Sequence, residues 1–264
     1  MNSQREGKIM KLITTLLLGL FLTSCAHKMN PQENYLMGIL FTQKAAEHTA
    51  LTLQAFNVAT ERLDKIKREY RGKKQLAVVL DVDETVLDNS PFQGKLYVQS
   101  ESFNYDNWKK WIAQKKAHPV AGALRFTKAA HKKGFKVFYL TNRSVKFKDD
   151  TIENLRKVGF PQHYNSIFKS SERSKEGRRQ ALAKKHHLAL LIGDNLTDFS
   201  KLYDEQSTQM RKEVVLKNHS KDFGKKFIVL PNTMYGDWDK ALLKYKKLNE
   251  SDKRCERTSQ LTVF

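Results

Sequence analysis

Residues 76–85 read Leu-Ala-Val-Val-Leu-Asp-Val-Asp-Glu-Thr, and this stretch decides the fold. Its first five residues form a continuous apolar run, which is typical of a short strand buried on both faces of a parallel sheet. Two carboxylates, those of Asp81 and Asp83, follow directly and are separated by one residue. Ligands of open parallel sheets bind at the carboxyl ends of the strands. The stretch therefore predicts a parallel sheet with an acidic site at its edge.

The chain downstream alternates helices and strands. Apolar runs predict strands at Lys136–Leu140, near Ile167–Phe168, at Leu188–Ile192 and at Lys226–Leu230. The intervening segments predict helices at Val120–His131, Ile152–Val158 and Glu176–His187, and Gly134 and Gly159 follow the first two, as glycine commonly does at helix C-termini. This alternation predicts an α/β doubly wound parallel sheet with right-handed crossovers.

Two further stretches are predicted to form a small, mainly helical cap. Residues 32–70 carry apolar side chains at spacings of three and four, which predicts two helices. Residues 89–118 are polar and rich in aromatic residues, and they interrupt the alternation directly after the first strand. An insertion at that point can cover the edge of the sheet where the acidic site lies. The remaining chain, residues 25–264, is predicted to be one domain.

Composition limits the class of protein and its partners. With 264 residues, 40% of them hydrophobic, the chain can bury one sizeable core. The formal net charge of +20 attracts nucleic acid, anionic membrane surfaces or phosphorylated ligands without choosing between them. The lysines are spread along the predicted helices rather than interleaved with aromatic residues. This pattern favours a solvated basic face, so no specific nucleic-acid partner is expected. A homodimer is left open.

The first 24 residues have the pattern of a signal peptide. A basic start is followed by the apolar run Leu12–Leu22, which is about half as long as the ~20 residues that span a membrane. The sequence Leu22-Thr23-Ser24-Cys25 resembles the bacterial lipobox and predicts lipid on Cys25, an attachment to the cell envelope and, because Ala26 follows, the outer membrane. An ordinary secretory peptide with an incidental cysteine is the alternative. If Cys25 is acylated, only Cys255 remains, and no intramolecular disulfide can form.

Polar residues follow the other predicted strands. Thr141 and Asn142 follow the second strand, and such groups at a strand end can hold phosphate oxygens. Lys175 lies at the start of a helix, where anions are favoured. Asp194 and Asp198 follow the strand that ends near Ile192. Carboxylates for a cation and donors for an anion are therefore expected in one place.

The order of these motifs resembles that of the haloacid dehalogenase superfamily. More narrowly, the stretches Val82–Pro91 and Phe227–Asn232 look like those of class C (subclass IIIB) acid phosphatases, which are bacterial lipoproteins. The resemblance implies that Asp81 attacks phosphorus and that Asp83 acts as general acid and then general base. It also implies Mg²⁺ held by Asp81, the backbone carbonyl of Asp83 and Asp194, with Asp198 positioning a bound water.

The resemblance also implies the substrate contacts. Thr141, Asn142 and Lys175 are expected to bind the phosphoryl group of small phosphomonoesters, nucleoside 5′-monophosphates in particular. Three aromatic residues are expected to clasp the organic part, although ordinary packing within the cap is their alternative: Phe92, Trp108 and Tyr235. Two other functions remain open, a phosphotransferase of the same fold and a non-enzymatic surface lipoprotein that binds metal structurally. The paired Asp81 and Asp83 favour the phosphatase.

Overall fold

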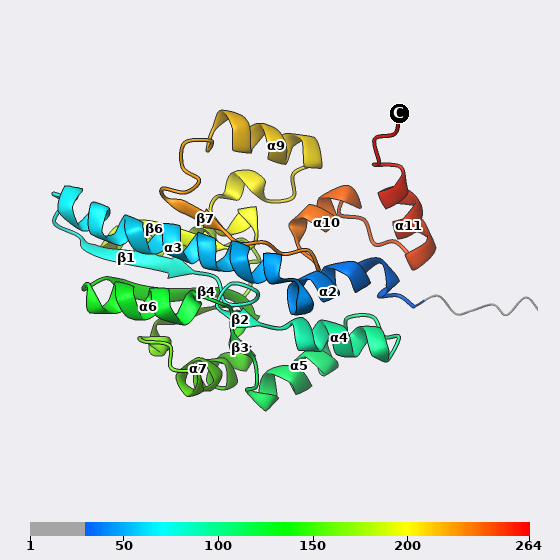
Figure 1. The fold of residues 1–264 in the computed structure, drawn as a ribbon, viewed down its shortest axis with the longest axis horizontal. Helices are drawn as coiled ribbons and strands as arrows, with labels where there is room; N and C mark the ends of the chain where they lie inside the picture. The colour runs from blue at the N-terminus through cyan, green and yellow to red at the C-terminus, as the bar shows by residue number, and fades with distance from the viewer. Residues whose placement is uncertain (1–29) are drawn as a thin grey trace, which may run out of the picture. The chain divides into compact units, whose positions relative to one another are not determined.

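A five-stranded parallel sheet forms the centre of the computed structural model, which describes residues 30–264 (Figure 1). The strand order is β5-β4-β1-β6-β7, so β1 lies in the middle. The strands are β1 (Gln75–Leu80), β4 (Lys136–Ser144), β5 (Ser166–Lys169), β6 (His186–Gly193) and β7 (Phe227–Val229). Each predicted strand is present, and the parallel sheet is confirmed. A separate antiparallel pair joins β2 (Leu87–Asp88) to β3 (His118–Pro119).

The crossover helices also match the prediction. They are α6 (Ala123–Lys132), α7 (Lys148–Lys157) and α8 (Glu176–Lys185). Gly134 and Gly159 follow α6 and α7 with φ values of +86° and +87°. Only glycine adopts this left-handed conformation without strain, which explains why both helices end there.

Residues 32–70, which were predicted to belong to the cap, form two helices that pack against different parts of the fold. The helices are α2 (Leu36–Lys44) and α3 (Ala46–Glu69). α3 lies beside α6 (Figure 1), and its Phe56, Ala59 and Leu63 are fully buried in the same cluster as the sheet residues. This helix therefore belongs to the core of the sheet, because its apolar stripe packs there. α2 lies instead against α4 (Ser90–Val98).

Residues 89–118 form two helices, α4 and α5 (Tyr105–Gln114). Asn104 caps α5 by accepting a hydrogen bond from the backbone N–H of Asn107 at 2.8 Å. These two helices lie between β2 and β3 in the chain, at the carboxyl end of β1. The division of the whole chain into a phosphatase domain and a cap stays a prediction.

Three helices and several short turns were not predicted. The helices are α9 (Thr208–Lys217), α10 (Asp237–Leu242) and α11 (Glu250–Thr258), and the 3₁₀ turns are η2 (Val145–Phe147), η3 (His163–Asn165), η4 (Leu196–Asp198) and η5 (Lys201–Tyr203). A further 3₁₀ turn, η1 (Glu33–Tyr35), lies within the stretch 32–70 that was predicted to be helical. Arg257 of α11 bonds Asp239 of α10 at 2.9 Å and Tyr35 of η1 at 2.7 Å. This contact joins the C-terminal helices to the start of the described chain.

The predicted signal peptide and Cys25 lie outside the described residues. Among residues 30–264, none of the helices combines the length and the apolar character needed to cross a membrane.

Candidate active site

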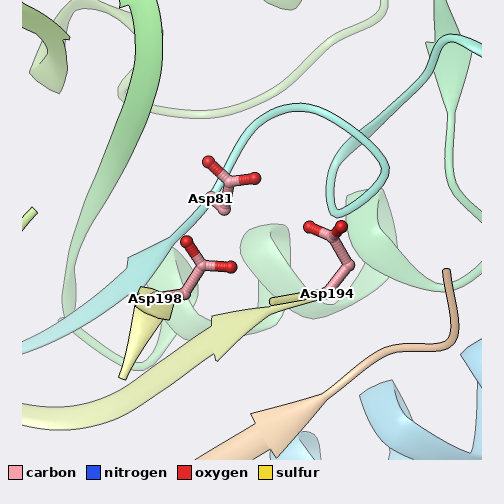
Figure 2. A group of neighbouring side chains, drawn as sticks. All are labelled: Asp81, Asp194 and Asp198. Carbon is pink, nitrogen blue, oxygen red and sulfur yellow. The ribbon is translucent and has the colours of Figure 1, made fainter. Parts of the chain in front are cut away.

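Three aspartates converge at the carboxyl ends of β1 and β6. Asp81 follows β1, Asp194 follows β6, and Asp198 lies in η4, and each offers a carboxylate oxygen within 4.8 Å of the other two. Figure 2 shows the three carboxylates grouped at these strand ends. The backbone N–H of Asp81 donates to the carbonyl of Ile192 at 2.9 Å, so the pairing of the two strands continues to the site. We call these residues the acid cluster.

Glycine at position 193 allows Asp198 to approach the strand. A Cβ at Gly193 would collide with the side chain of Asp198. η4 is held by a capping box, in which Asn195 and Asp198 exchange side-chain to backbone bonds. Oδ2 of Asp198 accepts from the backbone N–H of Asn195 at 3.0 Å. The short turn after β6 therefore fixes the third carboxylate.

Asp194 is oriented by two neutral donors. Thr85 donates its hydroxyl to Oδ1 at 3.1 Å, and Asn232 donates its amide to Oδ2 at 2.8 Å. The amide oxygen of Asn232 accepts from the backbone N–H groups of Met234 and Tyr235 at 3.0 and 3.3 Å. One asparagine side chain thus joins the acid cluster to the segment that carries Tyr235.

Lys175 supplies positive charge beneath the cluster. Its side chain is 5% exposed, and its ammonium donates to Asp81 and to Oδ1 of Asp198, the latter at 2.6 Å. Arg179, one turn further along α8, donates to the carbonyl of Asp198 at 2.9 Å. With Lys175 on Oδ1 and the backbone N–H of Asn195 on Oδ2, both oxygens of the Asp198 carboxylate are bonded by the protein.

The acid cluster fits a hard divalent cation. Burial raises the pKa of Asp81 well above its usual range; the Lys175 ammonium opposes this rise and the neighbouring carboxylates add to it. Burial, with Asp198, raises the pKa of Asp194 to about 6. Crowded carboxylates of this kind favour a cation, and an all-oxygen donor set suits Mg²⁺. The three carboxylates of the acid cluster could together hold such an ion.

The Asp83 side chain lies outside this cluster. Its Oδ1 accepts from Nη2 and Nε of Arg143 at 2.7 and 2.9 Å, and from the amide of Asn89 at 2.8 Å. Neither Arg143 nor Asn89 was among the predicted site residues. Arg143 directly follows Thr141 and Asn142 at the end of β4, and that position is the signal that could have identified it.

The two predicted phosphate-binding residues of β4 occupy different positions. Asn142 lines the cavity above the acid cluster, whereas Thr141 is fully buried and its hydroxyl accepts from the backbone N–H of Arg143 at 3.0 Å. Arg178 of α8 donates to the carbonyl of Thr141 at 2.7 Å and to Oδ1 of Asn142 at 2.6 Å. Arg178 therefore fixes the end of β4.

A cavity of about 950 Å³ opens over the acid cluster. Aromatic side chains form part of its wall, which we call the aromatic wall: Tyr35, Phe103, Trp108 and Tyr235. The hydroxyl of Tyr235 donates to the buried Glu84, which also accepts from the backbone N–H of Asn89 at 2.9 Å.

Phe92 does not line this cavity, unlike the other two predicted aromatic contacts. It is 2% exposed and packs behind the wall, with ring centroids 5.1 Å from Trp108 and 6.2 Å from Phe103. Phe103, which follows α4 in the chain, is 59% exposed and lines the cavity. Phe103 was not among the predicted contacts.

Comparison with known proteins agrees with this geometry. The family model described as "HAD superfamily, subfamily IIIB (Acid phosphatase)" matches residues 21–238. The chain belongs to this family. Among solved structures, the class C acid phosphatase from Bacillus anthracis is 36% identical with a TM-score of 0.85, and the match covers 89% of this chain and all of that one.

Two further relatives of this subfamily IIIB protein are informative. The Bacillus anthracis class C acid phosphatase with tungstate bound matches with a TM-score of 0.83 and 36% identity, over 90% of this chain and 99% of that one. "Acid phosphatase 1" of Solanum lycopersicum is 34% identical over 94 residues, which are 36% of this chain and 37% of the tomato protein. The match thus spans little more than a third of this curated relative.

Proposed function

We propose that this subfamily IIIB protein hydrolyses small phosphomonoesters, with nucleoside 5′-monophosphates as the preferred class, through a phosphorylated Asp81. The observation that carries the proposal is the position of Asp81, whose buried carboxylate faces two further carboxylates and a lysine at the floor of a large cavity. A tetrahedral oxyanion, tungstate, is bound in the related Bacillus anthracis enzyme, and it has the shape of phosphate.

In the first step a carboxylate oxygen of Asp81 attacks phosphorus. The new bond from Asp81 to phosphorus forms as the ester bond breaks, and the leaving oxygen keeps the electron pair of that bond. The carboxyl group of Asp83, which lines the cavity, gives this oxygen its proton. The alcohol departs, and Asp81 carries the phosphoryl group.

In the second step water attacks the phosphorylated Asp81. The Asp83 carboxylate accepts a proton from this water as the new bond to phosphorus forms, and Asp81 leaves with its electron pair. Phosphate is released and both carboxyl groups return to their starting states. Dividing one difficult displacement into two easier ones is the advantage of a covalent intermediate.

Two positive groups offset the negative charge of this site. Mg²⁺ bound by Asp81, the backbone carbonyl of Asp83 and Asp194 would supply charge beside the phosphoryl oxygens. Lys175 lies between Asp81 and Asp198 and supplies charge from the protein itself. Asn142, at the end of β4, provides a polar group in the lining of the same cavity.

The aromatic wall supports a nucleotide as the preferred substrate. Phe103, Trp108 and Tyr235 border the same cavity as Asp81, and the cavity is large enough for a base and a ribose. Stacking a base on aromatic side chains stabilises a complex by about 1–3 kcal/mol.

The substitution Asp81→Asn tests the nucleophile. It should lower phosphate release from adenosine 5′-monophosphate on the order of 10³-fold or more, because the attacking oxygen is lost. The fold should persist by circular dichroism. Asp64→Asn is a matched control, since it removes an exposed aspartate that pairs with Lys133 far from the cavity. Near-normal turnover by the Asp81→Asn variant would contradict the proposal. Adding alcohol acceptors to the wild-type assay tests the alternative, because a phosphotransferase would form new phosphate esters.

Lipid attachment at Cys25 in the cell envelope is a separate proposal, which rests on the lipobox alone. Labelled palmitate should enter the full-length protein when it is expressed in a bacterium, and Cys25→Ala should abolish the labelling. Labelling that persists in the Cys25→Ala variant would contradict the anchor.

A further inference from the structure

The two oxygens of the Asp83 carboxyl group have different surroundings. Oδ1 accepts three hydrogen bonds at 2.7 to 2.9 Å, two from Arg143 and one from Asn89. Oδ2 has a single long contact, 3.3 Å from Nε of Arg143. The Asp83 side chain is 20% exposed and lines the cavity. Oδ1 therefore accepts three short hydrogen bonds, while Oδ2 has one contact near the outer limit of a hydrogen bond.

Arg143 is itself held rigidly. Its side chain is 2% exposed, and Nη1 donates to the hydroxyl of Thr151 on α7 at 3.1 Å. Nη2 also donates to Oδ1 of Asn89 at 3.2 Å, and the same oxygen accepts from the indole N–H of Trp111 at 2.8 Å. A guanidinium presents its donors in a fixed planar fork, so contacts on several sides fix its orientation.

The guanidinium also lies over Trp108 of the aromatic wall, 5.3 Å from the ring centroid. A cation at this distance from an indole face is attracted by it. Nε and Nη2 of the same group hold Asp83. Arg143 therefore contacts both Trp108, which borders the site for the substrate's organic part, and Asp83, the proposed general acid.

We propose that Arg143 is a positioning residue for the general acid: it clamps Oδ1 of Asp83 and so fixes the orientation in which Oδ2 meets the leaving oxygen. This inference rests on the proposed function, because it requires Asp83 to protonate the leaving group. Lysine cannot reproduce the clamp, since an ammonium lacks the planar fork.

The leaving group provides the test. An acidic alcohol leaves readily as an anion and needs little protonation, whereas a basic one depends on the general acid. Phenyl phosphate and 4-nitrophenyl phosphate have similar shapes, but their phenols differ in acidity. Arg143→Gln should lower kcat/KM for phenyl phosphate about tenfold more than for 4-nitrophenyl phosphate, a part of the roughly 10²-fold that general acids contribute. Arg143→Lys should behave in the same way.

Arg211→Gln is the matched control. Arg211 is also a buried arginine, 6% exposed, that donates to the carbonyl of Tyr203 at 2.9 Å and lies 5.9 Å from its ring. Its replacement should destabilise the fold while the ratio of kcat/KM between the two esters stays that of the wild type. Should Arg143→Gln fold poorly, Thr151→Val removes only the Nη1 partner and should shift the ratio in the same direction by less.

Asp83→Asn separates the inference from the proposed function. This variant should show the full leaving-group preference, and adding Arg143→Gln to it should not change the ratio further. If Asp83→Asn slows both esters equally, the acid role in the proposed function fails, and the role of Arg143 fails with it. If Asp83→Asn discriminates but Arg143→Gln slows both esters equally, the role of Arg143 is overturned and the proposed function stands.

Discussion

The acid cluster and the aromatic wall border one cavity but are built in different ways. Asp81 and Asp194 follow neighbouring strands of the sheet, and pairing of the backbones sets their separation. The wall comes from the chain outside the sheet, and its Phe103 is 59% exposed. The chemistry therefore depends on strand order, while substrate choice depends on how peripheral segments pack. Changes to the two regions should have separable effects.

Removing divalent metal should have the largest effect. Chelation should lower turnover on the order of 10³-fold, because the charges of the acid cluster and the phosphoryl group then repel one another without a counter-ion. Added Mg²⁺ should restore the rate. Phosphate release measured before and after Mg²⁺ addition checks this, with circular dichroism as a control for the fold. Indifference to the chelator would contradict a metal role for Asp81 and Asp194.

Asp194→Asn should abolish activity and yet stabilise the metal-free protein. Burial and Asp198 raise the pKa of Asp194 to about 6, so its charge opposes folding at pH 7.5. Removing that charge should raise Tm by about 2–4 °C, the shift that ~1 kcal/mol produces in a domain of this size. Thermal unfolding in the presence of chelator measures it.

The stability gained by Asp194→Asn should also depend on pH. For a carboxyl group with a raised pKa in the folded state, the destabilisation is absent below the unfolded pKa and grows as pH rises to about 6. The gain from Asp194→Asn should therefore be present at pH 7.5 and shrink at pH 5. A gain that is equal at both values would show that it arises from packing rather than from charge.

A comparison of two phenylalanines separates packing from contact. Phe92→Ala should lower the free energy of unfolding by about 3–5 kcal/mol, because it empties a buried site behind the wall. Phe103→Ala, at an exposed position, should change it by less than about 0.5 kcal/mol. Urea denaturation measures both, and only Phe103→Ala should raise KM without loss of stability. The reverse ranking would contradict the described wall.

Trp108→Ala should have the smallest effect. It should raise KM for adenosine 5′-monophosphate about five- to tenfold, near the lower end of the ~1–3 kcal/mol attributed to base stacking. KM for a small aliphatic phosphate should change little, since such a substrate has no ring to stack. Steady-state kinetics with both substrates check this. Equal changes would show that Trp108 serves packing within the cap.

Local patterns were sufficient to predict the sheet and the residues at its edge. The run from Leu76 to Leu80 is typical of a strand buried in a parallel sheet, and the carboxyl ends of parallel strands meet at one edge. Gly134 and Gly159 marked helix ends because glycine adopts their left-handed conformation with little strain, whereas other residues are strained there. Such signals lie within a few residues of the feature that they predict.

Features that depend on tertiary contacts were missed. Arg143 holds Asp83 across 60 positions of the sequence, and nothing in its neighbours indicates that partner. Phe92 and Phe103 are the same residue type, and only tertiary packing distinguishes the buried ring of Phe92 from the exposed ring of Phe103. α11 buries none of its residues, so it lacks the apolar periodicity by which a helix is recognised.

Asn232 limits how freely this scaffold can be redesigned. Its amide nitrogen bonds Asp194, and its amide oxygen holds the backbone that carries Tyr235. A loop graft after β7 that is meant to alter selectivity would also disturb a carboxylate of the acid cluster. Phe103 has no such link among the described contacts, so directed evolution of new specificities should begin in the segment between α4 and α5.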